Sequence, residues 1–329
     1  MPSMRKVGWR GRLSLLAALA LVLGTGYLVG ERYAARDWLP WFRSQKGSLV
    51  SVTEVERQPV PEGALRLLRL ADDRGLIVNV QVREPPPDER PHPVLLTLGG
   101  INSGGRVAEM FPDTGRIMLV SIDYPYEGRR RRLSAWEFIT RLPAMRRAVM
   151  LTPPATMLVL DYLYGRDDVD RQRIVLVGGS FGALLAPAAA AAESRISGLA
   201  ILLGAGDLQS LIEANIDVPA PLEGPVAWAA NLVVSPVEPL KYIHRVAPRP
   251  SLLVSGTGDR RMPEALGQKL HDQARQPRTS VWLEMGHATL ESPEFRALVA
   301  AALAEWLVET GFLSPADAEA VRSLGVDRS

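Results

Sequence analysis

The sequence predicts an α/β fold with a mostly parallel central sheet and helices on both faces. Short apolar runs that suit strands alternate with longer stretches that suit helices from residue 94 onward. Two alternating segments, residues 65–70 and 76–82, flank the turn 72–75 and predict an antiparallel hairpin ahead of the parallel strands. With 329 residues, 47% of them hydrophobic, the chain can bury one large core or two small ones.

The individual elements follow from local patterns. Parallel strands are expected at residues 94–98, 117–122, 174–177, 199–203, 251–255 and 280–284. Helices are expected at about residues 154–164, over the alanine-rich run 183–192, and from Ser292-Pro293 to about Glu309. Residues 208–240 hold prolines and short apolar segments without a strand pattern, and their length suits a lid above the sheet.

The N-terminal part contains a long uncharged segment. Residues 13–30 would extend about 27 Å as a helix, close to the roughly 30 Å of a bilayer's hydrocarbon core. Four basic residues precede this segment and mixed charges follow it, which places the N-terminus in the cytoplasm. We expect a basic cytoplasmic segment at 1–12, a transmembrane signal anchor at 13–30 and a juxtamembrane linker at 31–62. The protein would then be a single-pass membrane protein whose main domain lies outside the cytoplasm.

Two other interpretations of residues 13–30 stay open. A cleaved signal peptide fits the basic start, although no clear A-x-A cleavage site follows the apolar segment, and it would give a secreted protein. The third interpretation is a soluble amphipathic or buried helix.

Charge and composition exclude several classes of function. The chain has 38 basic and 36 acidic residues, and four of the basic residues lie within the first 12 positions, so the rest carries 34 − 36 = −2. This balance argues against a nucleic-acid partner. The absence of cysteine excludes disulfides, cysteine-ligated zinc and a cysteine nucleophile. Four scattered histidines without paired spacing argue against a metal site.

One stretch carries the strongest functional signal. Residues 173–185 begin as a β-branched apolar run, turn through glycines and continue into an alanine-rich helix. Ser180 lies at this turn as Gly178-x-Ser180-x-Gly182, the pattern of a nucleophile elbow. The spacing has a physical reason: the serine adopts a strained backbone conformation, and strand and helix come so close that side chains at 178 and 182 would collide.

Three residue types that acyl transfer requires each follow a predicted strand, in the order Ser180, Asp259 and His287. Catalytic groups of parallel sheets gather at the carboxyl ends of the strands. A neutral imidazole can take the proton of the serine hydroxyl, because the hydroxyl alone is a poor nucleophile. A carboxylate on the other ring nitrogen fixes the tautomer and stabilises the imidazolium.

With this order and this strand pattern, residues 63–312 resemble the α/β-hydrolase superfamily, and its serine esterases and lipases in particular. The resemblance is strongest at residues 175–185, at 240–263 and at Gly286-His287. It implies an α/β-hydrolase domain at 63–312 with a lid at about 208–240, followed by a C-terminal tail at 313–329. It also implies a triad with Ser180 as nucleophile, Asp259 as orienting acid and His287 as base.

The resemblance further implies an oxyanion hole made of the N–H of Phe181 and an N–H of the glycine loop after residue 98, at Gly100 or Ile101. Members with a His-Gly start to this loop carry histidine where Leu98 stands here, so this chain departs from that pattern. Asp207 and Asp123 also follow strands, but in this fold the acid usually follows the strand after the lid, which favours Asp259. The other histidines are expected to be structural or exposed: His92, His244 and His271.

These observations together predict a membrane-tethered serine hydrolase that cleaves carboxylic esters of a small-molecule or lipid substrate through an acyl-enzyme intermediate. The chemistry requires no cofactor. Two alternatives stay open. One is an acyltransferase or peptidase that uses the same triad, and the other is a non-catalytic hydrolase-like binding module.

Overall fold

The computed structural model describes residues 9–60, 63–88, 90–100, 104–110, 114–126, 135–288 and 292–323. The chain separates into two compact units, Met1–Asp37 and Trp38–Ser329. The described part of the first unit contains the helix α1 (Trp9–Ala35), and the second unit contains all the other elements.

The expected membrane anchor lies within α1. No helix in the described part of the chain is long and apolar enough to cross a membrane. The predictions of a transmembrane signal anchor, of membrane tethering and of a single-pass membrane protein are therefore wrong, while the cleaved signal peptide stays a prediction.

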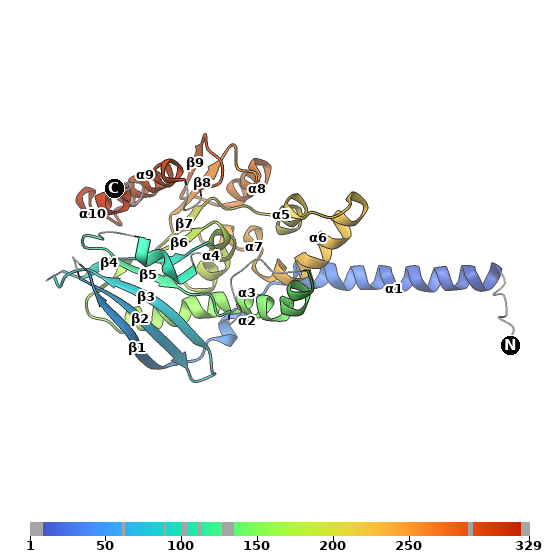
Figure 1. Ribbon diagram of the computed structural model, residues 1–329, viewed down its shortest axis with the longest axis horizontal. Coiled ribbons are helices and arrows are strands. Elements are labelled where there is room, and N and C mark those ends of the chain that lie inside the picture. The colour runs from blue at the N-terminus through green and yellow to red at the C-terminus, as the bar shows by residue number, and fades with distance from the viewer. Residues whose placement is uncertain are drawn as a thin grey trace. The chain divides into compact units, whose positions relative to one another are not determined.

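A single sheet organises the second unit (Figure 1). Its strands, counted over the described residues, are β1 (Leu49–Pro59), β2 (Ala64–Asp72), β3 (Ile77–Glu84), β4 (His92–Leu98), β5 (Met118–Ile122), β6 (Val169–Gly179), β7 (Gly198–Leu202), β8 (Ser251–Gly256) and β9 (Arg278–Leu283). They lie in the order β1-β2-β3-β5-β4-β6-β7-β8-β9. The first three strands and the β3–β5 pair are antiparallel, and all the other pairs are parallel.

Helices cover both faces of this sheet. Their bounds are α2 (Leu39–Gln45), α3 (Ala135–Tyr164), α4 (Phe181–Ala192), α5 (Leu208–Asn215), α6 (Ala220–Val234), α7 (Pro239–Tyr242), α8 (Glu264–Gln273), α9 (Pro293–Glu309) and α10 (Pro315–Arg322), with 3₁₀ turns η1 (Gly104–Met110), η2 (Ser235–Val237) and η3 (Ile243–Arg245). Figure 1 shows α9 and α10 on one side of the sheet and α2, α3 and α4 on the other. The predicted α/β fold with a mostly parallel sheet is confirmed.

The central strands are buried on both faces, as expected for parallel strands between two helical layers. Every residue of β4, β5 and β8 is buried. On one face, Val175 and Leu252 belong to a core cluster that also contains Trp306 of α9 and Val321 of α10. On the other face, the alanine-rich α4 packs closely because its side chains are short; Ala188 and its neighbours are fully or nearly fully buried.

Three elements differ from the sequence-based expectations. β1 lies in the predicted linker, and its side chains from Val50 to Pro59 are exposed, so it is held by backbone pairing with β2 and shows no buried face that a pattern could reveal. α10 lies in the predicted tail, where Ala318 and Val321 pack into the core cluster. α3 is much longer than predicted, because it continues through three internal prolines.

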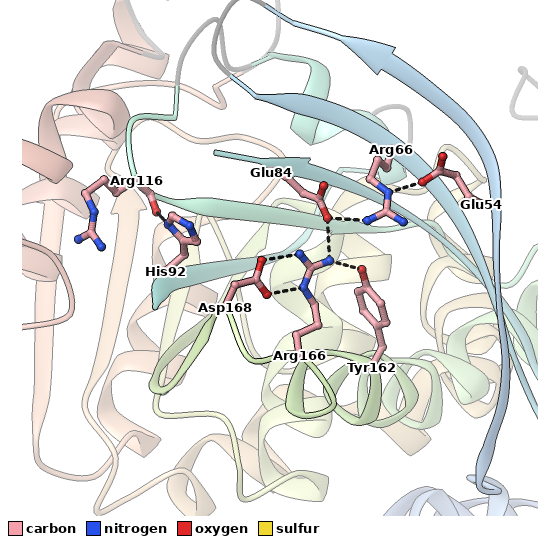
Figure 2. A network of polar contacts seen from close by, with 8 residues as sticks. All are labelled: Glu54, Arg66, Glu84, His92, Arg116, Tyr162, Arg166 and Asp168. Atoms are coloured by element: carbon pink, nitrogen blue, oxygen red, sulfur yellow. Dashed lines mark hydrogen bonds and ion pairs between the residues drawn. The ribbon is translucent and has the colours of Figure 1, made fainter. Parts of the chain in front are cut away.

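A network of ion pairs connects strand ends at one edge of the sheet (Figure 2). The loops that carry the predicted catalytic residues lie at the opposite edge. Glu84, at the end of β3, accepts from Arg66 of β2 and from Arg166, both at 2.7 Å. Arg166 also pairs with both oxygens of Asp168 just before β6, at 2.8 and 2.6 Å. Burial opposes the charge of Arg166, but the bonds to Asp168 and Glu84 raise its pKa above its ordinary value. The network therefore ties the hairpin to the parallel strands.

A buried histidine joins α8 to β8. Ser255 Oγ and His271 Nε2 are 3.1 Å apart, and the His271 ring stacks on Trp282 of β9 at 4.7 Å. His271 is only 2% exposed. Burial, and to a lesser degree the charge of Arg278, lowers the pKa of His271 to about 4. The imidazole is therefore neutral in the folded protein at pH 7.

We predict that His271 makes the free energy of unfolding fall with acid. As pH drops from about 6.5 towards 4, the unfolded chain binds a proton at this position and the folded chain does not, a loss of up to about 3 kcal/mol. Urea unfolding of wild type and His271→Gln at pH 7 and pH 4.5 measures this difference, and the variant should lose less stability. His244→Gln, at a partly exposed histidine, should retain most of the drop; a parallel drop in all three proteins would contradict the prediction.

Candidate active site

The turn between β6 and α4 has the geometry of a nucleophile elbow. Ser180 has φ 51° and ψ −111°, a backbone conformation that side chains rarely adopt. A Cβ added to Gly178 would lie 2.7 Å from Ala186 Cβ and 2.8 Å from the Gly182 carbonyl oxygen. A Cβ added to Gly182 would lie 1.9 Å from the Leu98 carbonyl oxygen. Both glycines are therefore required by close packing, as the spacing predicts.

Two loops at the same edge of the sheet carry Asp259 and His287. Gly258 N–H donates to the Met285 carbonyl at 3.0 Å, which joins the loop after β8 to the loop after β9. A Cβ on Gly256 would lie 2.6 Å from the same carbonyl oxygen, so the close approach needs glycine there. Because both loops leave neighbouring parallel strands at their carboxyl ends, the carboxylate and the imidazole meet.

The three side chains form a continuous chain of hydrogen bonds. Ser180 Oγ and His287 Nε2 are 2.8 Å apart, and His287 Nδ1 and Asp259 Oδ2 are 2.6 Å apart. The other carboxylate oxygen, Oδ1, accepts from the N–H groups of Arg261 and Met262 at 2.8 and 2.9 Å. The side chains of Asp259 and His287 are 1% and 7% exposed. The contact with the Asp259 carboxylate favours the His287 tautomer that carries its proton on Nδ1, in which Nε2 is the acceptor facing Ser180 Oγ.

The predicted oxyanion-hole residues lie partly within the described chain. Phe181 is the first residue of α4, so its N–H belongs to the unpaired donors of a helix start. Gly100 follows β4 at the end of the neighbouring strand. Ile101 lies outside the described residues. The short distance between Gly182 and the carbonyl of Leu98 brings the start of α4 and the loop after β4 together.

The two competing aspartates lie elsewhere. Asp207, with φ 62°, caps the start of α5 by accepting from Ser210 N–H at 3.2 Å, and Lys269 Nζ lies 2.5 Å from its Oδ2. Lys269 and Ser210 hold the pKa of Asp207 below its ordinary value, although burial alone would raise it. Asp123 follows β5, where its N–H donates to the Asn79 carbonyl. Of the three aspartates, Asp259 is the one with a hydrogen bond to His287 among the described contacts.

The predicted lid, residues 208–240, folds as α5, α6 and η2 and ends within α7. Glu238 connects the start of this segment to its end. Its carboxylate accepts from the N–H groups of Asp207, Leu208 and Leu240 at 2.9, 2.7 and 3.1 Å. Burial raises the pKa of Glu238 despite these bonds. Asn215 Nδ2, at the end of α5, donates to the Arg261 carbonyl at 3.0 Å. The lid therefore contacts the loop that carries Asp259.

Sequence reasoning missed two residues near this edge of the sheet. Glu238 carries no local signal, because its role depends on two segments that are distant in sequence. Tyr124 is the second residue after β5, and its hydroxyl donates to the carbonyl of Gly99 in the glycine loop. An aromatic residue two positions after a predicted strand was the available signal. Within the described residues, no group of three or more histidine, aspartate or glutamate residues could hold a metal ion.

The fold and this geometry agree with known proteins. The model of the prolyl oligopeptidase family matches residues 154–311, a segment that contains Ser180, Asp259 and His287. The acetyl xylan esterase from Paenibacillus sp. R4 is similar in structure, with TM-score 0.60 and 17% identity over 81% of this chain and 92% of that chain. The family match and the structural similarity are both of the kind found in the α/β-hydrolase superfamily. The prediction of a serine hydrolase of this superfamily is confirmed by the family match and by these structures.

Two further α/β-hydrolase structures extend the comparison. Acetyl xylan esterase 1 from Thermoanaerobacterium sp. JW/SL YS485 has TM-score 0.54 and 16% identity, over 82% of this chain and 91% of that chain. A puromycin-hydrolyzing peptidase of Mycobacterium tuberculosis has TM-score 0.56 and 18% identity, over 76% of this chain and 40% of that chain. No curated protein sequence matches the chain. At these identities the structures establish the fold and leave the substrate open.

The elbow glycines offer a matched pair of substitutions. Gly182→Ala should lower the free energy of unfolding by about 2 kcal/mol and reduce activity, because the new methyl group meets the Leu98 carbonyl and backbone must move. Gly179→Ala should be tolerated, since a Cβ at Gly179 has no atom within 4 Å. Chemical denaturation and ester turnover measure both effects. Equal stability of the two variants would show that the elbow is not tightly packed.

Proposed function

We propose that this protein is a carboxylic ester hydrolase in which Ser180 is the nucleophile, His287 the general base and Asp259 the orienting acid. The observation that carries the proposal is the unbroken hydrogen-bond chain from Ser180 through His287 to Asp259, with separations of 2.8 and 2.6 Å. Its position at the carboxyl edge of a parallel sheet, on a strained elbow, supports the same roles.

The reaction follows from these positions. His287 Nε2 takes the proton of Ser180 as the oxygen attacks the ester carbonyl, and Asp259 stabilises the imidazolium that forms. The N–H of Phe181 and an N–H of the glycine loop, at Gly100 or Ile101, bind the oxyanion of the tetrahedral intermediate. The imidazolium then protonates the leaving alcohol, which leaves an acyl-Ser180. Water, deprotonated by His287, attacks this ester and releases the acid, and the proton returns to Ser180.

The substrate class is proposed as a small-molecule carboxylic ester. Two of the structurally similar proteins are acetyl xylan esterases by name, which supports an ester with a short acyl group. The alternative is amide cleavage or acyl transfer on the same triad, supported by the prolyl oligopeptidase family match over residues 154–311. A non-catalytic binding module would have no use for the buried and fully paired Asp259–His287 couple.

The nucleophile assignment predicts the outcome of active-site labelling. A fluorophosphonate probe should label wild type and leave Ser180→Ala unlabelled, and the kcat/KM of Ser180→Ala for p-nitrophenyl acetate should fall about 10⁴-fold or more. Ser197→Ala, at a serine away from the triad, should label and turn over like wild type. Equal labelling of wild type and Ser180→Ala would overturn the assignment.

The acid assignment separates Asp259 from Asp207. Asp259→Asn should lower kcat about 10³- to 10⁴-fold, because the amide stabilises the wrong imidazole tautomer and no imidazolium partner remains. Asp207→Asn should keep kcat within about 3-fold of wild type, because its carboxylate caps α5 and pairs with Lys269. Steady-state kinetics on one ester decide between them. The opposite ranking would move the acid role to Asp207.

The reaction type is tested by leaving group and acceptor. If ester hydrolysis is the activity, p-nitrophenyl acetate should be turned over faster than the matching p-nitroanilide, and added alcohol or amine should leave free acetate as the main product. Chromatography of the products measures the partition of the acyl group. A predominant acetylated acceptor would instead identify an acyltransferase, and a faster anilide reaction would identify a peptidase.

A further inference from the structure

Tyr124 lies between the two parts of the chain that hold the proposed oxyanion donors. It is the second residue after β5 and is 7% exposed. Its hydroxyl donates to the carbonyl oxygen of Gly99, the residue after β4. Its ring meets the ring of Phe181 edge-on, with centroids 5.3 Å apart and an interplanar angle of 81°. One side chain therefore contacts both the glycine loop and the first residue of α4.

The bond to Gly99 controls the direction of a neighbouring N–H. The carbonyl of Gly99 and the N–H of Gly100 belong to one planar peptide unit, and the bond between these residues is trans. In a trans unit the C=O and the N–H point in opposite directions. Holding the Gly99 oxygen against Tyr124 therefore fixes where the Gly100 N–H points. Glycine at both positions would otherwise leave this peptide unit free to rotate.

The contact with Phe181 fixes the second donor relative to the first. Phe181 lies between Ser180 and Gly182, and Gly182 is packed so closely that an added Cβ would lie 1.9 Å from the Leu98 oxygen and 2.9 Å from the Gly99 oxygen. The edge-on ring pair adds about 0.5–1.5 kcal/mol beyond burial. The Gly99 carbonyl is thus enclosed by the start of α4 and by the Tyr124 hydroxyl. Neither donor can move without disturbing Tyr124.

We propose that Tyr124 is the positioning residue of the oxyanion hole: its hydroxyl orients the Gly99–Gly100 peptide, and its ring holds Phe181 at the matching distance. This inference rests on the proposed ester hydrolysis and on Gly100 as the loop donor. Tyr124 acts through the backbone and does not touch the reacting atoms, because its hydroxyl is engaged with Gly99. Oxyanion stabilisation acts in the transition state, so the loss of positioning lowers kcat and leaves KM unchanged.

Tyr124→Phe removes the hydroxyl and keeps the ring on Phe181. The kcat for p-nitrophenyl acetate should fall about 10- to 100-fold, while KM stays within about 2-fold. This fall is no larger than the fall in kcat expected when a whole oxyanion donor is removed. The affinity for a trifluoromethyl ketone, whose adduct with Ser180 carries an oxyanion, should fall by the same factor as kcat/KM. Tyr126→Phe is the matched control, because the buried Tyr126 hydroxyl has no hydrogen-bond partner among the described residues, and it should match wild type.

The outcomes separate this inference from the proposed function. If Ser180→Ala is inactive and Tyr124→Phe matches wild type in kcat and ketone affinity, the inference fails and the ester hydrolase stands. If Ser180→Ala keeps its activity, the proposed function itself fails. If Tyr124→Phe does not fold, Phe181→Leu replaces it, since it removes the ring contact and keeps the hydroxyl. A fall in its kcat at constant KM supports the proposal, and an unchanged kcat overturns it.

Discussion

The arrangement depends on one steric constraint, the contact between the start of α4 and the end of β4. No side-chain atom fits between Gly182 and the Leu98 carbonyl, and none fits between Gly178 and Ala186. This packing forces Ser180 into a strained conformation, which its N–H bond to the Leu202 carbonyl and the bond it accepts from Ala183 N–H help to hold. The same contact brings Phe181 next to the glycine loop. The positions of the proposed nucleophile Ser180 and of the proposed oxyanion donor Phe181 thus share one steric cause.

The two edges of the sheet carry different kinds of polar contact. At the edge where the parallel strands begin, Glu84, Arg166 and Asp168 form a dense network of charge-assisted bonds that ties strands together. At the opposite edge, the loops after β8 and β9 bring Asp259 against His287, with each carboxylate oxygen paired. The ion pairs hold together the edge where the parallel strands begin. The loops at the opposite edge extend from the same strands, so a rigid sheet helps to position the proposed catalytic residues.

The predicted lid, residues 208–240, is connected by a polar bond to the loop that carries Asp259. Glu238 connects the start of this segment to its end, and Asn215 reaches the backbone of the Asp259 loop. A change in the position of the predicted lid would therefore alter the position of Asp259, the proposed orienting acid. Apolar contacts support the same join, since Leu208 and Leu211 of α5 pack with Leu266 of α8. These contacts couple the predicted lid to the proposed proton relay.

The sequence by itself determined the sheet, the elbow and the order of the three polar residues, because buried strands and a glycine-flanked serine leave strong local patterns. It predicted a membrane span at residues 13–30, and this prediction is wrong, because no helix in the described part of the chain is long and apolar enough to cross a membrane. It missed β1, whose side chains are mostly exposed, and α10, a helix of only eight residues. Only the tertiary structure decided that Asp259 rather than Asp207 meets His287, and that Tyr124 and Glu238 join distant segments. These contacts depend on how the crossovers between strands bring loops together in space, which no local pattern encodes.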